Sequence, residues 1–499
     1  MHPDNSHPTS TASAAGRTAG KSVAWSFTGS VLAIATGLVW AVAIPRLLGP
    51  DDYGSLAVVN SLIEIAATVS GLGAAAVFAR FHPTILAGSG RAAFAQAASL
   101  YIVVIAGLGT VLGAVVWLSL RSMGTLGPGY LVAVAGGVGA VLLAIFYGSN
   151  ARLYGENRLR EYSLWAPGKL MAAVVLVPLL HRWRGVAGAV YGLVAANGLG
   201  VLAMTIVSRP LTAHCFTRSS LRWLREFLPF GVLAMSASLT ITATVRGGNI
   251  ALAAIGTPSD QVAFFALGVN IVFQAQFLAS SLGQGLVPTL SHLIERGDQQ
   301  RAQEWIARCA KYQVVMGLLF VATVLLVGEP ALDLVLGDKY QGLWPIAVAL
   351  SPGAIIIANR TLSMRMAAPL RCPRVSVESL VASVVPFVLG TLLLGPHMGI
   401  WGAVIAFLGG AAIGATVAAV RIRTLSGMTV VDRKTALTLG VGAALLGIVA
   451  WSMPDCAWLR LVVLAVYTLG LLGALGALRL LMASEIRQMV QMVRGKSSA

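Results

Sequence analysis

Charged residues are scarce in this sequence. Lys, Arg, Asp and Glu make up 11% of its 499 residues, whereas 57% are hydrophobic. In soluble domains roughly a quarter of the residues are charged, so a soluble chain of this composition would leave much apolar surface in water. The composition excludes an ordinary soluble globular protein.

Residues that carry enzyme or metal chemistry are also few. The four cysteines form no CxxC pair, which argues against a disulfide framework or a zinc site. The stretch 16–22 has three residues, not the four of a Walker A motif, between its first glycine and the Gly-Lys pair. HExxH and GxSxG are absent, and His292 with Glu295 lacks a second metal ligand. We predict no catalytic residue, no metal and no cofactor, and expect that the protein is not an enzyme.

Acidic residues number only 18 against 35 Lys and Arg, which gives a formal net charge of +17. Nucleic-acid binding is one source of such a bias. Here the cations stand in short clusters between apolar runs, and no basic domain exists that could bind a duplex. We therefore predict no nucleic-acid partner and assign the cations to cytoplasmic loops of a membrane protein.

Long apolar runs fill the chain from residue 22 onwards. The first run is too long for the hydrophobic region of a signal peptide and is expected to be a retained span. Residues 1–20 are polar and are expected to form a disordered cytoplasmic tail. At about 20 residues per span, the runs predict an all-α, polytopic membrane protein with fourteen helices at residues 22–47, 53–79, 93–120, 129–150, 162–181, 185–208, 227–255, 260–290, 312–336, 342–369, 375–395, 399–421, 435–452 and 458–482.

The positions of the cations predict the orientation of these helices. With the N-terminus inside, 26 of the 35 Lys and Arg fall in inside segments, 6 fall in outside segments and 3 lie within spans. This bias predicts an even number of spans and two cytoplasmic termini. The longer inside connections, 209–226 and 296–311, interleave Trp and Arg and are expected to lie along the inner membrane surface.

An internal repeat relates the two halves of the chain. Asn60 and Glu64 stand four apart on one helical face, and Asn270 and Gln274 repeat this spacing 210 residues later. Parallel repeats of this kind place the substrate path at their interface. The prediction is therefore two six-helix lobes, 21–208 and 227–423, joined by an interfacial linker at 209–226 and followed by two helices at 424–483 and a cytoplasmic tail at 484–499.

Three cations, Lys169, Arg246 and Arg360, lie within predicted spans. Each would cost about 2.5–3.5 kcal/mol if it faced lipid, so they are expected to face the bundle interior or a wet cavity. Glu64 is the acid near mid-span that can pair with them, and the surplus of positive charge favours an anionic ligand such as a phosphate.

Several of the charged residues have a plainer alternative interpretation. Lys169 lies near the cytoplasmic end of its span and can reach the interface with its side chain. Arg46 is either an interfacial anchor or a gate residue, and Asp51 and Asp52 are expected to cap the second helix. Glu64 is either a salt-bridge partner or a site of H⁺ or Na⁺ coupling. The candidate cavity residues are Arg246, Arg360, Lys169 and Arg46 for the anion, with Glu64, Asn60, Asn270 and Gln274 as polar or coupling residues.

The stretch Ile44-Pro45-Arg46-Leu47-Leu48-Gly49-Pro50-Asp51-Asp52-Tyr53-Gly54, with Ser70-Gly71-Leu72-Gly73 after it, resembles the start of the polysaccharide-biosynthesis flippases. These belong to the multidrug/oligosaccharidyl-lipid/polysaccharide exporter superfamily. The resemblance implies two six-helix lobes around a cationic cavity and alternating access. It also implies a substrate made of undecaprenyl pyrophosphate bearing an oligosaccharide, with membrane lipids, a polysaccharide polymerase and glycosyltransferases as partners.

Other functions stay open at this point. A flippase for the lipid-linked peptidoglycan precursor also has fourteen helices and a cationic cavity. An ion-coupled multidrug exporter usually has twelve spans and an acidic cavity, which is the opposite charge to the one found here. A non-transporting scaffold for glycosyltransferases, which belongs to a different class, predicts that the intramembrane cations are dispensable.

Overall fold

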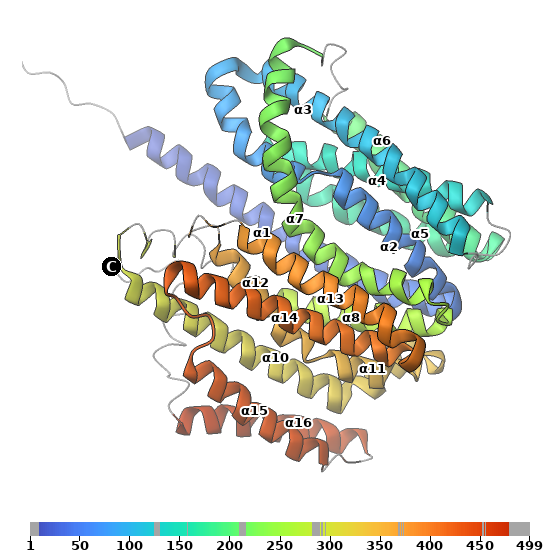
Figure 1. Ribbon diagram of the computed structural model, residues 1–499, viewed down its shortest axis with the longest axis vertical. Coiled ribbons are helices and arrows are strands. Elements are labelled where there is room, and N and C mark those ends of the chain that lie inside the picture. Colours follow the sequence, from blue (N-terminus) through green and yellow to red (C-terminus); the bar gives the residue numbers. More distant parts are fainter. Residues whose placement is uncertain are drawn as a thin grey trace, which may run out of the picture. The chain divides into compact units, whose positions relative to one another are not determined.

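The computed structural model describes residues 9–123, 130–156, 158–208, 216–281, 296–367, 374–451 and 456–478, together with residues 290, 293, 294, 370, 372 and 454. The described residues contain helices and no strand (Figure 1). Apart from one 3-10 turn at Asp338–Tyr340, the helices are α1 Thr9–Leu48, α2 Pro50–Ser70, α3 Ala74–Met123, α4 Tyr130–Gly155, α5 Leu159–Arg184, α6 Val186–Ser208, α7 Arg218–Ala254, α8 Ser259–Ser281, α10 Gln299–Leu336, α11 Leu343–Leu350, α12 Gly353–Met366, α13 Arg374–Met398, α14 Ile400–Ser426, α15 Arg433–Trp451 and α16 Ala457–Ala477.

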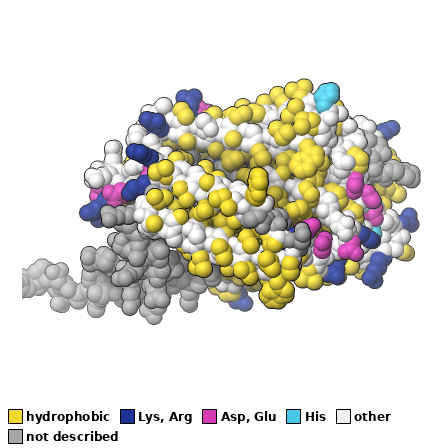
Figure 2. Space-filling model, turned by 90° about the horizontal axis from the view of Figure 1, so that it is seen from below, with side chains coloured by type: hydrophobic (Ala, Val, Ile, Leu, Met, Phe, Trp, Pro, Cys, Tyr) yellow, Lys and Arg dark blue, Asp and Glu magenta, His cyan; other side chains and the backbone are white. Residues whose placement is uncertain are grey.

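Helices lie at all fourteen positions that the apolar runs predict, and the all-α, polytopic membrane fold is confirmed. Twelve helices in the described residues are long and apolar enough to cross a membrane, and the bent helix α7 raises the number to thirteen. Helix α8, Ser259–Ser281, covers residues 260–281 of the expected span 260–290, and most of the remainder of that span lies outside the described residues. Figure 2 shows hydrophobic side chains over much of the face that it draws.

The expected N-terminal tail differs from the structure. Helix α1 begins at Thr9, so residues 9–20 are helical, whereas residues 1–8 lie outside the described part. The segment contains Ala12, Ala14, Ala15 and Ala19, and alanine has the highest helix propensity of all residues, which offsets the Ser and Thr content. The expected tail at 484–499 also lies outside the described residues.

The chain divides into two compact units, Met1–Ala263 and Phe264–Ala499. In the first, α3 packs on α4, α5 packs on α1 and α6, and α7 packs on α2 and α3. In the second, α13 packs on α14, α12 packs on α14, and α10 packs on α15 and α16. The division differs from the expected lobes, because α7 opens the second lobe in the sequence-based prediction and instead packs within the first unit.

The second expected span, 53–79, is interrupted. It consists of α2 and the beginning of α3, separated by Gly71-Leu72-Gly73, where Leu72 has φ +43° and Gly73 has φ +62°. Tyr101 of α3 donates its hydroxyl to the Leu72 carbonyl at 2.7 Å and so provides a partner for a backbone oxygen that the break releases. A side chain at Gly231 of α7 would collide with this pair, so α7 approaches the break closely only because residue 231 is glycine.

The acids at the start of α2 do not cap it through their side chains. The N-cap residue is Gly49, Pro50 opens the helix, and Asp51 and Asp52 lie in the first turn, where the helix dipole favours negative charge. Asp52 is 2.7 Å from the Nε2 atom of His181 on α5. The expected capping role is therefore replaced by a contact between two helices.

The inside connection at residues 209–226, which is expected to lie along the membrane surface, leads into helix α7. Thr217 and Ser220 form a capping box, in which the Thr217 hydroxyl accepts from the Ser220 amide at 3.1 Å. Phe227, in the third turn of α7, is fully buried and packs against Phe81 with ring centroids 5.1 Å apart. The second connection enters α10, whose N-cap Asp298 accepts from the Arg301 amide at 3.2 Å. Residues 218–226 and 299–311 are thus helical; their place along a membrane surface stays a prediction.

Candidate functional site

A largely buried ion pair joins α2 to α7 in the first unit. Glu64 accepts from Arg246 through both of its oxygens, at 2.7 Å from Nε and 3.0 Å from Nη2. Asn60, one turn before Glu64, donates to the same carboxylate at 3.0 Å. The exposed fraction of the Arg246 side chain is 16%, and that of Glu64 is 26%. Two-pronged pairing of this kind is the strongest way in which arginine binds a carboxylate.

The ion pair is the middle one of three polar contacts between α2 and α7. On α2 the participating residues are spaced by three and four positions, which places them on one helical face. The contacts run in opposite chain directions on the two helices, as expected for antiparallel neighbours. They are Ser61 with Asn249 at 3.0 Å, Glu64 with Arg246, and Thr68 with Thr242 at 3.2 Å. We call this set the α2–α7 ladder.

Lys169 on α5 lies close enough to this ladder to interact with it electrostatically. Its Nζ atom donates to Asn197 of α6 at 3.2 Å and lies 5.2 Å from the centroid of the Phe146 ring. Glu64 attracts both Lys169 and Arg246. The cluster of Glu64, Arg246 and Lys169 therefore contains two cations and one carboxylate, which leaves one positive charge in excess.

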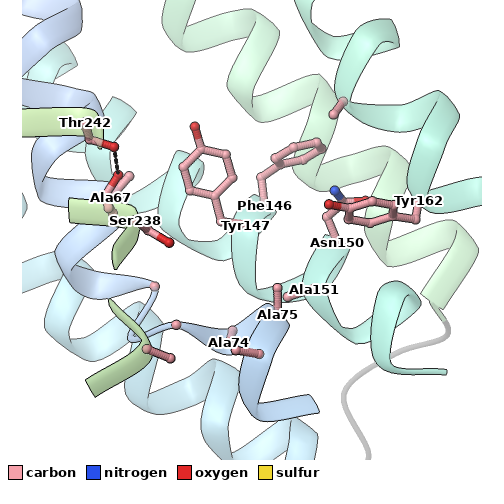
Figure 3. A pocket seen from close by; sticks show the side chains of 16 residues that line it. Ala67, Ala74, Ala75, Phe146, Tyr147, Asn150, Ala151, Tyr162, Ser238 and Thr242 are labelled. Carbon is pink, nitrogen blue, oxygen red and sulfur yellow. Dashed lines mark hydrogen bonds between the residues drawn. The ribbon is translucent and has the colours of Figure 1, made fainter. Parts of the chain in front are cut away.

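A cavity of about 480 Å³ lies beside the ladder. Thr68 and Thr242 of the ladder line it together with Ser238, Tyr147, Asn150 and Tyr162 (Figure 3). Asn150 is 8% exposed, and its side-chain oxygen accepts no hydrogen bond from a described residue. Most of the other lining residues are Ala or Gly, and neither Arg246 nor Lys169 lines the cavity. The Lys169 Nζ atom lies 5.2 Å and 6.0 Å from the ring centroids of Phe146 and Tyr147, which do line it.

The helix break at residues 71–73 forms another part of the cavity wall, through Gly71 and Gly73. In membrane proteins, irregular backbone at this depth is tolerated where it is buried in protein or lines a cavity, and broken helices commonly mark substrate sites. The break, the hydroxyl and amide groups of the wall and the neighbouring cation cluster therefore point to one site in the first unit.

Arg360 of the second unit has different surroundings. It lies on α12, is 1% exposed, and donates from Nη1 to the Ser383 hydroxyl on α13. Among the described residues, its Nε atom has no hydrogen-bond partner and no carboxylate forms an ion pair with Arg360. The neighbouring Thr361 accepts from Gln276 of α8 at 3.2 Å.

The structure brings four of the eight candidate residues together: Glu64, Asn60, Arg246 and Lys169. Arg46 is exposed near the end of α1. Asn270 and Gln274 are half-buried on α8, and neither forms a hydrogen bond with a described residue. The roles of all eight residues in binding or coupling stay predictions.

Sequence reasoning missed several polar residues of the site. Asn249, Asn197 and Asn150 lie within apolar runs, and that isolation is a signal that could have identified them. The spacing of Ser61, Glu64 and Thr68 could also have indicated a polar helical face. Nothing in the sequence alone pairs that face with α7.

Comparisons with known proteins agree with the fold. The profile of a family described as "Polysaccharide biosynthesis protein" matches residues 19–294, more than half of the chain. No curated protein sequence matches the chain.

Several solved structures share the fold. A structure described as the lipid II flippase MurJ in an inward closed conformation is similar with a TM-score of 0.72 and 11% identity, covering 90% of this chain and 98% of that one. An inward-facing multidrug resistance MATE family transporter of the MOP superfamily gives a TM-score of 0.63 at 18% identity, with 80% and 96% covered. A mutant of the Vibrio cholerae MATE transporter VcmN gives a TM-score of 0.51 at 19% identity, with 83% and 98% covered.

These similarities concern the fold, whereas the profile match concerns the sequence itself. The match begins within α1 and ends beyond α8, so it includes the α2–α7 ladder and the cavity. This chain is a multi-pass membrane protein with the fold of the MOP-superfamily transporters, and it belongs to the polysaccharide biosynthesis protein family.

Proposed function

We propose that this protein is a flippase. It would move an undecaprenyl-pyrophosphate-linked oligosaccharide repeat unit from the cytoplasmic to the outer leaflet of a bacterial inner membrane, for exopolysaccharide or O-antigen synthesis. The observation that carries the proposal is the excess of positive charge in the cluster of Glu64, Arg246 and Lys169, which lies next to a cavity within membrane spans. The family match supports a substrate from polysaccharide synthesis, and a diphosphate is the part of such a substrate that cations attract.

In this proposal Arg246 changes partners during transport. In the structure it is held by Glu64, while Lys169 has an amide as its hydrogen-bond partner. A diphosphate that enters the cavity competes with Glu64 for Arg246 and gains Lys169 as a second cation. The ladder joins α2 to α7 within the first unit. Its loosening would let these two helices move apart beside the cavity, which is the kind of change that alternating access needs.

The direct test is export of glycan from cells that carry single substitutions. We expect Arg246→Gln, Lys169→Met and Arg360→Gln each to reduce export and to cause lipid-linked sugar to accumulate. The matched control is Arg184→Gln at the end of α5, which is exposed and does not line the cavity. If all three intramembrane variants export as well as the parent, the cavity proposal is wrong, and a non-transporting scaffold becomes the better explanation.

Coupling to an ion gradient is a separate part of the proposal. Glu64 is the acid of the cluster, so H⁺ or Na⁺ binding would have to displace Arg246 from it. If Glu64→Gln leaves the dependence of transport on the ion gradient unchanged, Glu64 is not the coupling site. The chain would then use it as a structural partner of Arg246.

A second candidate is a flippase for the lipid-linked peptidoglycan precursor, which is favoured by the structural similarity to the lipid II flippase. The two candidates differ in the sugar that accumulates when the gene is deleted. Identification of that sugar discriminates between them, and neighbouring genes for glycosyltransferases and a polymerase would favour the first. An ion-coupled multidrug exporter is disfavoured, because the excess of cations would repel cationic drugs.

A further inference from the structure

A second cavity in the first unit lies away from the proposed transport site. It has a volume of about 410 Å³ and lies among the ends of three helical segments. Arg91 lines it from the part of α3 that follows Gly90, and Arg152 from the last turn of α4. Glu156, the residue after α4, and Arg158, the residue before α5, complete the charged part of the lining. We call it the arginine pocket.

Positive charge dominates the arginine pocket. Glu156 is 2.8 Å from Nε of Arg152 and 3.8 Å from Nη1 of Arg158. Arg158 is also bound by Glu161, at 3.1 Å. Three arginines therefore share two carboxylates, which leaves one positive charge in excess.

Two of the arginines have donors that remain for a ligand. Arg152 is 8% exposed, and among the described residues its only hydrogen bond is the one from Nε to Glu156. A guanidinium has five N–H donors, so the terminal nitrogens of Arg152 have no acceptor in that part of the chain. Arg91 is exposed and forms no ion pair with a described residue. A buried arginine with unused donors, facing a cavity, is a built anion site.

The other lining residues of the pocket are mostly apolar, with His82 among them. Phe94 is buried and packs edge-on against His82, with ring centroids 4.5 Å apart, and Leu86 lies beside them. A free inorganic anion has no apolar part that could contact these residues. A phosphate that is attached to a lipid would place its charge on the guanidiniums and its glycerol and upper acyl carbons on the rings.

The position of the pocket along the chain agrees with a lipid ligand. Its arginines belong to the connections between the second and third and between the fourth and fifth expected spans. The cation count places both connections on the cytoplasmic side. Phosphate headgroups of the inner leaflet lie at that level.

We propose that the arginine pocket binds the phosphate headgroup of an anionic lipid from the inner leaflet. The site is distinct from the cavity beside the α2–α7 ladder, and occupancy does not require that the chain be a flippase. Arg91 and Arg152 bind the phosphate, and Glu156 keeps the Arg152 guanidinium oriented toward it.

The test is lipid retention by the full chain, purified in detergent and measured by native mass spectrometry. The probe is phosphatidylglycerol, with phosphatidylcholine as the headgroup whose phosphate charge is cancelled. We expect the parent protein to retain phosphatidylglycerol preferentially. Arg91→Gln/Arg152→Gln should weaken that retention about tenfold or more, which is the loss expected for a charge-assisted hydrogen bond.

Arg160→Gln is the matched control. Arg160 lies two residues from Arg158, is exposed, and stacks over Trp25, with its Cζ atom 5.6 Å from that ring's centroid, outside the pocket. Its variant should retain lipid like the parent. Arg152 is buried, and its loss removes the nearer of the two cationic partners of Glu156. Arg91→Gln alone therefore serves as the variant that is expected to keep the fold, and it should still weaken retention several-fold.

Three outcomes would overturn the proposal. The double variant, folded by its thermal transition, retains phosphatidylglycerol as well as the parent. Alternatively, Arg160→Gln loses as much lipid as Arg91→Gln, which would indicate a diffuse surface charge. Finally, millimolar inorganic phosphate displaces the lipid from the parent, which would identify free phosphate as the ligand of the pocket.

Discussion

Two arginines within membrane spans, Arg246 and Arg360, have opposite electrostatic surroundings. Arg246 is bound by both oxygens of Glu64, and Asn60 supports that carboxylate. Arg360 is more deeply buried, yet its hydrogen-bond partner among the described residues is the single hydroxyl of Ser383, and it forms no ion pair with any of them. The sequence signal was the same for both, a cation in an apolar run.

The difference teaches that an intramembrane cation can be either compensated by a carboxylate or left without a compensating charge. A compensated arginine is stable where it is, and an incoming anion must compete with its carboxylate. An uncompensated arginine keeps an unfavourable desolvation energy, which an anion can relieve. The first kind suits a contact that opens and closes, and the second suits a constant attraction for negative charge.

Removal of the Glu64 charge is the change with the largest expected effect. Glu64→Gln leaves Arg246 buried without its carboxylate, so we expect the free energy of unfolding to fall by about 3–5 kcal/mol. The measurement is thermal unfolding of the purified protein in detergent, alongside glycan export from cells.

The double variant Glu64→Gln/Arg246→Gln separates pairing from folding. With both charges gone, most of the lost stability should return, while export should stay low because Arg246 is missing. If the double variant is as unstable as Glu64→Gln, an unpaired Arg246 is not the cause of the lost stability. The interpretation that Glu64 compensates Arg246 at the α2–α7 contact would then be wrong.

Arg360→Met should change stability in the opposite direction. The substitution removes a buried charge that no described carboxylate compensates and keeps an apolar chain of similar length, so we expect the protein to become about 1–3 kcal/mol more stable. Export should fall nonetheless, if Arg360 attracts the diphosphate. The pair of assays is the same as for Glu64, and Ser383→Ala is the control that removes the hydroxyl but leaves the charge.

Gly73→Ala tests the break beside the ladder without touching a charge. Gly73 has φ +62°, and an added Cβ would lie 2.7 Å from the Cβ of Ala234 and 2.8 Å from the carbonyl oxygen of Gly231 on α7. We expect a loss of about 1–3 kcal/mol from backbone strain and displacement of α7. In a double-mutant cycle with Glu64→Gln the effects should couple, whereas with Arg360→Met they should add, because only Glu64 and Gly73 share the contact with α7.

The sequence predicted the fold more completely than the site, for a physical reason. Insertion into lipid depends on length and apolar content, which each run carries by itself, so all fourteen helices could be located. Which helix packs on which depends on close approach at particular residues. The contact of α7 with α2 requires Gly231 and the break at Gly71–Gly73. No periodicity in the sequence predicts that contact.

The candidate site shows the same limit at the level of single residues. Asn60 and Glu64 could be grouped because residues four apart share a helical face. The pairing of Glu64 with Arg246, 182 positions later, is a tertiary contact. The amide partner of Lys169 on another helix could not be predicted for the same reason, although its isolation in an apolar run marked Asn197 as unusual.

Arg46→Gln should have the smallest effect on stability and export. It tests whether burial, which Arg246 and Arg360 share, is what distinguishes the arginines that matter for transport. Arg46 stands at the outer end of the first predicted span, and in the structure it is exposed at the end of α1. An exposed substitution usually changes stability by less than about 0.5 kcal/mol, and we expect export to stay near the parent level. Stability and export are measured as for the other variants. A large loss of export with unchanged stability would assign Arg46 a role in gating, and burial would then no longer distinguish the arginines that matter for transport from those that anchor a helix end.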